Sequence, residues 1–394
     1  MTRMASLVLA FGFFISCTGQ RELLTENVEQ TETAVLLEQS QELLRDDPGS
    51  ADGHYMAGVA AYRQAVAETA PYRQDFYELM VTSFDKARQN YDNRSPALDH
   101  MHSLQQTAWS QEFARAQATQ TDPEASGLTT VHAQNAITLY PDSVQVHLLL
   151  SEIYLEQRDL EQAATYLFPV VQSGDRYGAY YERFAYLQTR NGNYDEAGSW
   201  YLRSIDWMKS FQSQSLSPAD NPAQRGSLLN AYHGAINTLS EAGNTELAIS
   251  LLNELTTAMD EAGPYHEMLI VQHLYLIRNA ALDTYTEFSA PAVEDAMYSI
   301  RLSTEAYPEL RPFAANEYID LASAYIDLQT ELNDSYQISQ SQTVGLFLEE
   351  ARYYYQAMLD AFPGNEEALY GMAATYNLTG NTDQAEAWLE QVNP

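Results

Sequence analysis

The sequence predicts an all-α protein, an α-solenoid in which antiparallel helix pairs repeat along the chain. Two observations from about residue 31 onward support this fold class. Apolar residues recur at i, i+3, i+4 and i+7, the period of an amphipathic helix, and no run of strict alternation persists. A short turn motif also recurs, as GNYDEA from Gly192, GNTELA from Gly243 and GNTDQA from Gly380.

The turn motif is interpreted as the joint between two helices. Gly192 is expected to end the first helix, because glycine adopts the left-handed backbone that often follows a helix. Asn193 is expected to cap the second helix, and Asp195 and Glu196 are favoured in its first turn by the helix dipole. Ala197 is then the small residue at which the two helices cross.

The spacing of these turns sets the length of the repeat. The alanines of related motifs are 34 residues apart in two places, Ala163–Ala197 and Ala351–Ala385. The interval Ala197–Ala248 is 51 residues, and the polar segment Ser213–Gly226 accounts for most of the extra length. A fixed period of helix pairs indicates units that stack and bury one continuous core.

The period and the residue types resemble the tetratricopeptide repeat (TPR), whose pattern is W-x2-L-G-x2-Y, A-x3-F and P over 34 residues. The last repeat carries the resemblance in Leu369, Met372, Ala373, Tyr376, Ala385 and Leu389. The best-matching segments are 144–177, 178–211, 229–262 and 366–394. The Trp of the pattern is absent. The resemblance implies a TPR-type solenoid over residues 31–394, a right-handed superhelix of about eight antiparallel helix pairs that begins with a helix near residues 31–46.

The composition excludes one class of partner. The chain has 54 acidic and 20 basic residues, a formal net charge of -34. A field of that sign repels nucleic acid, so no nucleic-acid partner is expected. The acidic residues are spread along the chain, which indicates a solvating surface. Adjacent carboxylates such as Glu349–Glu350 are interpreted as solvated helix faces.

The first residues have the pattern of a cleaved export signal. Arg3 is followed by an apolar run, Leu7–Ile15, which is shorter than the roughly 20 residues of a membrane-spanning helix. The small Ser16 then precedes Cys17, the only cysteine of the chain. The four residues FISC that end at Cys17 resemble the lipobox of bacterial lipoproteins.

The lipobox resemblance implies that residues 1–16 are a signal peptide and that Cys17 is acylated. Residues 17–30 are then expected to be a polar tether. The residue after the cysteine is Thr18 and not Asp. In this respect the chain resembles lipoproteins that are sorted to the outer membrane in proteobacteria. The expected location is therefore the cell envelope, as an exported outer-membrane lipoprotein. The alternative is an ordinary secretory signal whose cysteine is incidental.

No motif for catalysis or for a metal is present. HExxH, CxxC, an EF-hand loop, GxGxxG, a P-loop and GxSxG are all absent from the sequence. His100 and His102 point apart on a helix and cannot easily share a metal. His266 and His273, seven residues apart, are interpreted as ordinary helix histidines. The sequence thus predicts a protein that is not an enzyme and that holds no cofactor and no metal.

Tyrosine is common, with 28 residues. Most are expected to fill the core of the repeats. The three consecutive residues Tyr353–Tyr355 cannot all face the core of one helix, so some tyrosines are expected to be exposed. Tyrosine is favoured at protein interfaces because it combines apolar area with a polar tip.

The TPR resemblance also implies a binding face. In that family the first helix of each pair lines a concave surface that binds a peptide or a partner helix. The corresponding residues here are Glu182, Tyr186, Thr189, Asn230, His233, Asn237, Tyr370 and Asn377. This face has almost no Lys or Arg, which argues against a carboxylate clamp for an acidic tail.

The sequence therefore predicts a non-catalytic protein–protein interaction scaffold of the bacterial cell envelope. Its expected partners are a protein or peptide and, through the N-terminal lipid anchor, the membrane. The alternative is a ligand-capture lipoprotein that presents aromatic side chains to a glycan or peptide for an uptake complex. A third class, a hydrolase, would require a deep pocket with converging titratable groups.

Overall fold

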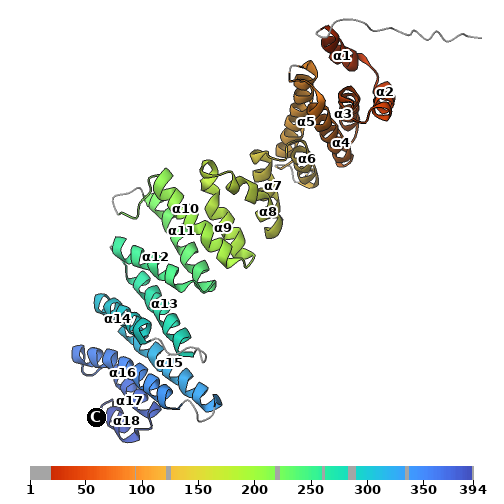
Figure 1. Ribbon diagram of the computed structural model, residues 1–394. Coiled ribbons are helices and arrows are strands. Elements are labelled where there is room, and N and C mark those ends of the chain that lie inside the picture. The colour runs from red at the N-terminus through yellow and green to blue at the C-terminus, as the bar shows by residue number, and fades with distance from the viewer. Residues whose placement is uncertain are drawn as a thin grey trace, which may run out of the picture. The chain divides into compact units, whose positions relative to one another are not determined.

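The computed structural model describes residues 19–93, 95–120, 126–217, 222–259, 262–282, 290–332 and 337–392. These residues form α-helices with three short 3-10 helices between them and no strand (Figure 1). The chain divides into two compact units, Met1–Tyr177 and Gly178–Pro394. Residues 1–18, which include the predicted signal peptide and Cys17, lie outside the described residues.

The first unit consists of eight helices. They are α1 (Gly19–Gln30), α2 (Thr33–Asp46), α3 (Ala51–Ala67), α4 (Arg73–Asn90), α5 (Pro96–Gln120), α6 (Ser126–Leu139), α7 (Val144–Glu156) and α8 (Leu160–Gln172). The 3-10 helix Ala70–Tyr72 precedes α4. After α2, the helices pack as sequential pairs, α3 with α4, α5 with α6 and α7 with α8.

The second unit begins at Gly178, within the 3-10 helix Asp175–Tyr180, and contains ten α-helices. They are α9 (Tyr181–Arg190), α10 (Tyr194–Phe211), α11 (Pro222–Glu241), α12 (Thr245–Ala258), α13 (Gly263–Leu282), α14 (Ala290–Ala306), α15 (Arg311–Leu332), α16 (Gln337–Ala361), α17 (Glu366–Leu378) and α18 (Thr382–Leu389). The third 3-10 helix, Pro308–Leu310, precedes α15. Sequential helices again pack as pairs. The two units together contain eight pairs within the described residues, as the period predicts.

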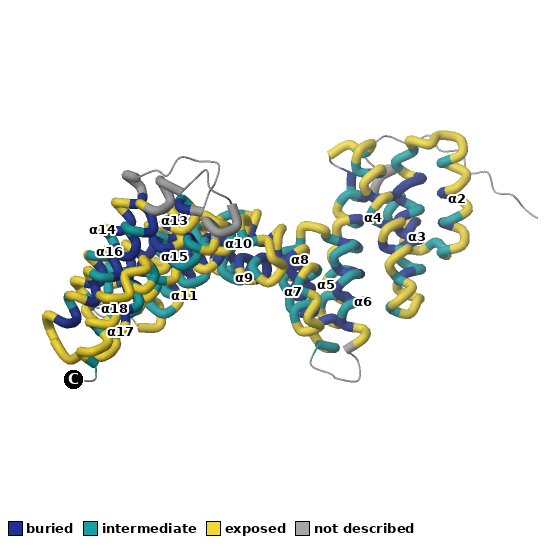
Figure 2. Tube along the Cα trace, turned by 90° about the horizontal axis from the view of Figure 1, so that it is seen from below, coloured by how far each residue is buried: buried dark blue, intermediate teal, exposed yellow. Residues whose placement is uncertain are grey.

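Each unit has a core that runs along its stacked helices. In the first unit, helices α1 to α6 share a core cluster centred on Tyr55, Tyr77 and Phe84, which are all buried. In the second unit, helices α13 to α17 share a cluster that includes Tyr318 and Tyr354. Figure 2 shows that buried residues follow the helix faces that pack on neighbours and that exposed residues cover the opposite faces.

Residues 17–30 were expected to be a polar tether, but the structure forms helix α1 over Gly19–Gln30. The difference arises because this segment is not wholly polar. Val28 is buried in the core of the first unit, and Leu24 packs against that core. The Arg63 side chain also binds the end of α1, with its Nη2 donating hydrogen bonds to the carbonyl oxygens of Val28 at 2.9 Å and Glu29 at 2.8 Å. At least the second half of α1 is therefore part of the folded unit.

The predicted helix joints have the expected backbone. Gly192, Gly243 and Gly380 adopt φ values of +80°, +76° and +73°, in the left-handed region. The cap prediction for Asn193 is only partly right. Asn193 lies at the N-cap of α10, but its side chain forms no cap hydrogen bond. Its amide instead donates to Gln188 Oε1 at 2.8 Å, at the end of α9.

The run Tyr353–Tyr355 behaves as its helical position predicts. Tyr354 and Tyr355 are buried, whereas Tyr353 is exposed. None of the helices in the described ranges combines the length and the hydrophobicity that a membrane crossing requires.

Candidate functional site

The eight predicted binding residues all lie in the second unit, on the first helices of three pairs. Glu182, Tyr186 and Thr189 are on α9, the next three are on α11, and Tyr370 and Asn377 are on α17. The term first-helix face is used below for the surface of α9, α11, α13, α15 and α17 on which these residues and their equivalents lie. Direct contacts join α9 to α11, α13 to α15 and α15 to α17.

On α9, the predicted residues surround one tyrosine of the neighbouring helix. Tyr201 on α10 is buried, and its phenol interacts with Thr189 and lies near Glu182 and Tyr186. Burial raises the pKa of the Glu182 carboxyl. The Thr189 hydroxyl also donates to the Ala185 carbonyl at 2.9 Å. Thr189 therefore has a structural role, whereas Tyr186 is half exposed and available to a partner.

The structure brings His233 and Asn237 together in a pocket of about 720 Å³ between α11 and α13. This pocket is called the α11–α13 pocket. Its wall consists of Arg225, His233, Asn237, Met259, Pro264, Tyr265 and Met268. One cation, one imidazole, one amide and one phenol thus face a space whose remaining wall is apolar. Such a combination of apolar wall and few polar groups is typical of a binding pocket.

Arg225 has an unusual environment for a cation in an acidic chain. Its Nη2 donates to the thioether sulfur of Met259 at 3.0 Å, and its Nε is buried without a hydrogen-bond partner. Among the residues that the structure describes, no carboxylate forms an ion pair with Arg225. Thioether sulfur is a weak acceptor, so the guanidinium retains unused capacity to donate hydrogen bonds.

The other polar groups of this pocket are neutral near pH 7, and burial shifts the pKa of two of them further towards the neutral form. It lowers the pKa of His233, so the imidazole stays uncharged. It raises the pKa of the Tyr265 phenol, although nearby Arg225 partly opposes this shift. The two rings are in contact, with centroids 5.7 Å apart and an interplanar angle of 34°. Arg225 is therefore the charged group of this wall.

The remaining predicted residues do not join this pocket. Asn230 is exposed one turn before His233 on α11. Tyr370 and Asn377 are exposed on α17, where Tyr370 is 51% exposed. They belong to the same face of the repeats but to a different place on it.

Sequence reasoning missed several residues of the first-helix face. Val271 and Tyr275 on α13 are 44% and 42% exposed, and they follow Met268 at helical spacing. They were missed because α13 lies outside the four segments that match the TPR pattern best. Arg225 was missed because it precedes the aligned segment 229–262. Pro222 is a signal that was available, since proline is favoured at the first position of a helix.

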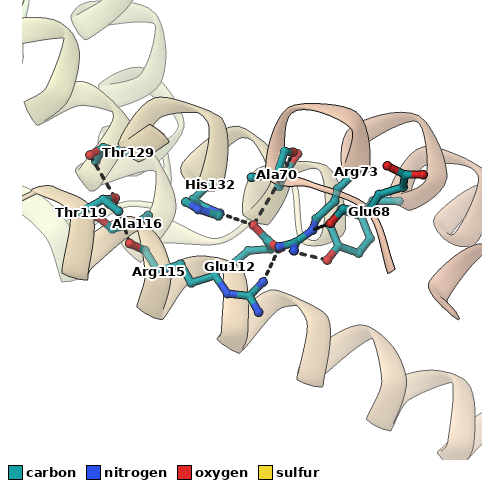
Figure 3. Close-up of polar contacts among 11 residues, drawn as sticks. Glu68, Ala70, Arg73, Glu112, Arg115, Ala116, Thr119, Thr129 and His132 are labelled. Atoms are coloured by element: carbon teal, nitrogen blue, oxygen red, sulfur yellow. Dashed lines mark hydrogen bonds and ion pairs between the residues drawn. The ribbon is translucent and has the colours of Figure 1, made fainter. Parts of the chain in front are cut away.

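The first unit contains a buried polar cluster that no sequence motif indicated. Glu112 on α5 is fully buried, and its carboxylate accepts hydrogen bonds from three helices (Figure 3). The donors, with their distances, are Arg73 Nη1 at 2.7 Å, Tyr77 Oη at 3.1 Å, Arg115 Nη1 at 3.0 Å, His132 Nδ1 at 2.6 Å and Asn135 Nδ2 at 3.3 Å.

The surroundings of Glu112 favour its ionised form. Burial alone raises the pKa of this carboxyl, but the hydrogen bonds from His132, Arg73 and Asn135 outweigh burial and lower it. With both oxygens occupied by donors, the carboxylate is not free to act as a base. We interpret the cluster as the polar link that holds α4, α5 and α6 together.

The first unit also has a smaller aromatic pocket of about 380 Å³. Trp109 and Tyr140 lie in its wall with their rings at 88°, and His102, Gln106 and Asp142 contribute polar groups. In neither unit do the described residues include a group of three His, Cys, Asp or Glu side chains placed to hold a metal ion.

Comparison with known proteins supports the fold prediction. Residues 348–394 match the family model of the tetratricopeptide repeat. This segment covers the second half of α16 together with α17 and α18. The predicted resemblance to TPR proteins and the all-α solenoid class are confirmed. A search of curated protein sequences gave no match.

Solved structures with similarity to this chain include two complexes and one isolated domain. A human IFIT1 dimer with PPP-AAAA shares 14% identity, with a TM-score of 0.24 over 90% of this chain and 66% of that chain. The TPR domain of P58(IPK) shares 12% identity, with a TM-score of 0.26 over 95% of this chain and 99% of that chain. Naa15/Naa10 bound to HypK-THB shares 12% identity, with a TM-score of 0.23 over 95% of this chain and 63% of that chain.

Proposed function

We propose that this protein is a non-catalytic scaffold of the bacterial cell envelope that binds a protein or peptide partner through the first-helix face of its second unit. Its TPR-type fold suggests protein–protein interaction, because such repeats present a continuous surface formed by neighbouring helix pairs. Binding then depends on shape and on side-chain contacts and requires no chemical step.

The observation that carries this proposal is a set of exposed apolar and aromatic side chains on first helices. Tyr186 on α9 is 50% exposed, Val271 and Tyr275 on α13 are 44% and 42% exposed, and Tyr370 on α17 is 51% exposed. Aromatic residues are enriched at interfaces because they bury large area at low entropic cost. Second helices of the same unit also expose large side chains, such as Tyr298 on α14, so the two faces have to be compared by experiment.

Site-specific photo-crosslinking tests which face binds the partner. A photoreactive phenylalanine analogue at Tyr186 or Tyr370 is expected to capture a partner protein in intact cells. The matched control is the same analogue at Tyr298, which is 62% exposed on α14, the second helix of its pair. Capture only at Tyr298 would locate the interface on the opposite side of the repeats and overturn the proposal.

The envelope location rests on the N-terminal sequence. We propose that Cys17 is acylated after removal of residues 1–16 and that the lipid holds the protein at the outer membrane. A cysteine that carries several acyl chains anchors stably, whereas a single chain holds only marginally. Incorporation of labelled palmitate is expected to disappear in Cys17→Ala. Unchanged labelling in that variant would show that Cys17 is not the acylated residue.

The ligand-capture alternative has one observation in its favour, the aromatic pocket of the first unit. Its wall combines Trp109 and Tyr140 with the polar side chains of His102 and Gln106, a combination suited to a neutral sugar. A glycan array separates the two functions. Retention of saccharides by the wild type but not by Trp109→Ala, with no protein captured from membranes, would favour the alternative.

A further inference from the structure

We propose that the α11–α13 pocket binds one carboxylate side chain of the partner, with Arg225 as the cation that recognises it. This inference rests on the proposed function, because the pocket lies on the same first-helix face. It adds the chemistry of the partner segment: one Asp or Glu beside an apolar residue, with neutral or basic residues on either side.

The hydrogen-bonding state of Arg225 provides the first argument. Its guanidinium carries five N–H donors, yet among the described residues its Nη2 donates only to the Met259 sulfur, at 3.0 Å, and its buried Nε has no partner. Hydrogen bonds from a guanidinium to a carboxylate are short, often bidentate and roughly twice as strong as neutral ones. A carboxylate that enters the pocket therefore gains a donor that no described residue of the chain uses fully.

The other polar groups select a carboxylate over a more highly charged group. The His233 imidazole is neutral near pH 7 because burial lowers its pKa, and the Asn237 amide is neutral as well. One positive charge matches the single charge of a carboxylate. Phosphorylated segments are instead recognised by clusters of arginines. Asn237 can donate a second hydrogen bond to a group held at Arg225, since both side chains line the same pocket.

The charge of the whole chain determines what surrounds that carboxylate. With 54 acidic and 20 basic residues, the protein repels a run of acidic residues. Only a segment with a single carboxylate gains the local contact without a large repulsive cost. Glu267 is exposed on α13 next to the pocket residue Met268 and favours basic flanking residues.

The apolar part of the wall accommodates the neighbour of the carboxylate. Met259, Pro264 and Met268 supply flexible or flat apolar surface, and the Tyr265 ring closes one side. Methionine adapts its shape to the group that it contacts, which suits an aliphatic residue of the partner.

Methyl NMR of the full chain with labelled methionine tests the inference, because Met259 and Met268 report from inside the pocket. The probes are three capped peptides, acetyl-KLELK-amide, acetyl-KLQLK-amide and acetyl-KL-phosphoserine-LK-amide, together with acetyl-KLQLK that has a free carboxyl terminus. The glutamate peptide is expected to shift both methyl signals with a Kd about tenfold lower than that of its glutamine counterpart.

Two variants identify the cation. Arg225→Gln is expected to remove the preference for the glutamate peptide. Arg278→Gln, which changes an exposed arginine of α13 outside the pocket, is expected to keep it. Circular dichroism checks that both variants are folded. If Arg225→Gln does not fold, the comparison of the glutamate and glutamine peptides on the wild type still decides the question.

Three results would overturn the inference: equal affinity of the wild type for the glutamate and glutamine peptides, a preference that survives in folded Arg225→Gln, or tighter binding of the phosphoserine or free-carboxyl peptide. These results are independent of the photo-crosslinking at Tyr186 and Tyr370. A partner captured there together with equal peptide affinities would leave the proposed function standing and reject only the carboxylate specificity.

Discussion

The aromatic ring of Tyr355 on α16 lies directly against the backbone of Gly371 on α17. A Cβ atom built on Gly371 would be 2.2 Å from Tyr355 Cζ. The Tyr355 hydroxyl donates a hydrogen bond of 2.5 Å to Asn316 Oδ1 on α15, which fixes the ring. The same contact recurs between Tyr201 on α10 and Gly234 on α11, at 2.4 Å. A glycine in the middle of a first helix thus leaves room for a tyrosine ring from the second helix of the preceding pair.

This contact predicts that Gly371→Ala destabilises the second unit by about 2 kcal/mol, because the added methyl group forces the Tyr355 ring to move in a packed core. The matched control is Gly345→Ala on α16. Gly345 has no atom within 4 Å of its would-be Cβ, so the substitution is expected to stabilise the helix by about 0.5–1 kcal/mol. Urea unfolding followed by circular dichroism measures both. A higher midpoint for Gly371→Ala would contradict the packing.

The regular part of the fold could be predicted because it is encoded locally. Ala197 and Ala385 mark where the two helices of a pair cross, and the glycine that begins each motif marks the joint between them. The Tyr355–Gly371 contact could not be predicted, because it joins different pairs. In sequence, a glycine within a helix indicates only a weaker helix.

The burial of polar residues was harder to predict from the sequence than the positions of the helices. Glu112 was not singled out, and Glu350 was interpreted as part of a solvated face, yet both are buried and paired. In a chain with 54 acidic residues, a single glutamate carries no local signal of burial. The partner of buried Glu350 is Arg301, whose Nε donates to its carboxylate at 2.9 Å from another helix pair. The positions of the first-helix face along the helices were predictable, but the α11–α13 pocket depends on how α11 and α13 pack.

Glu112→Gln is predicted to destabilise the first unit by about 3 kcal/mol. The change removes the charge that compensates Arg73, whose side chain is 13% exposed, and a buried cation without its partner is costly. The control is Glu38→Gln on α2, where the side chain is exposed and a small effect is expected. Chemical denaturation at pH 7 gives both values. Equal stability of the two variants would show that the cluster does not hold α4, α5 and α6 together.

The N-caps of the second unit provide a comparison between two asparagines. Asn365 Oδ1 accepts a hydrogen bond from the Ala368 amide at 3.0 Å at the start of α17. Asn244 occupies the N-cap of α12, but its side chain forms no cap hydrogen bond. Asn365→Ala is therefore predicted to lower the free energy of unfolding by about 1 kcal/mol, and Asn244→Ala by only a few tenths of a kcal/mol. Urea midpoints measured in the same buffer rank the two. A larger loss for Asn244→Ala would contradict the cap geometry.

His273 predicts a loss of stability in mild acid. This side chain is buried on α13, its Nδ1 has no hydrogen-bond partner, and burial lowers its pKa to about 4. The unfolded chain binds the proton near pH 6.5. Between these values the unfolded state holds more protons, so stability is complete above about pH 6.5 and falls as the pH falls towards 4. Between pH 6.5 and pH 4 the free energy of unfolding falls by about 3 kcal/mol through this residue.

His273→Leu is predicted to remove this contribution. Between pH 7.5 and pH 5.0, the variant should lose about 2 kcal/mol less stability than the wild type, because leucine does not titrate. The control is Ile270→Val in the same core, which creates a small cavity without a titrating group and should lower stability equally at both values. Urea unfolding of the three proteins at the two pH values provides the comparison. An identical pH dependence in the wild type and His273→Leu would mean that the imidazole is protonated in the folded state as easily as in the unfolded chain.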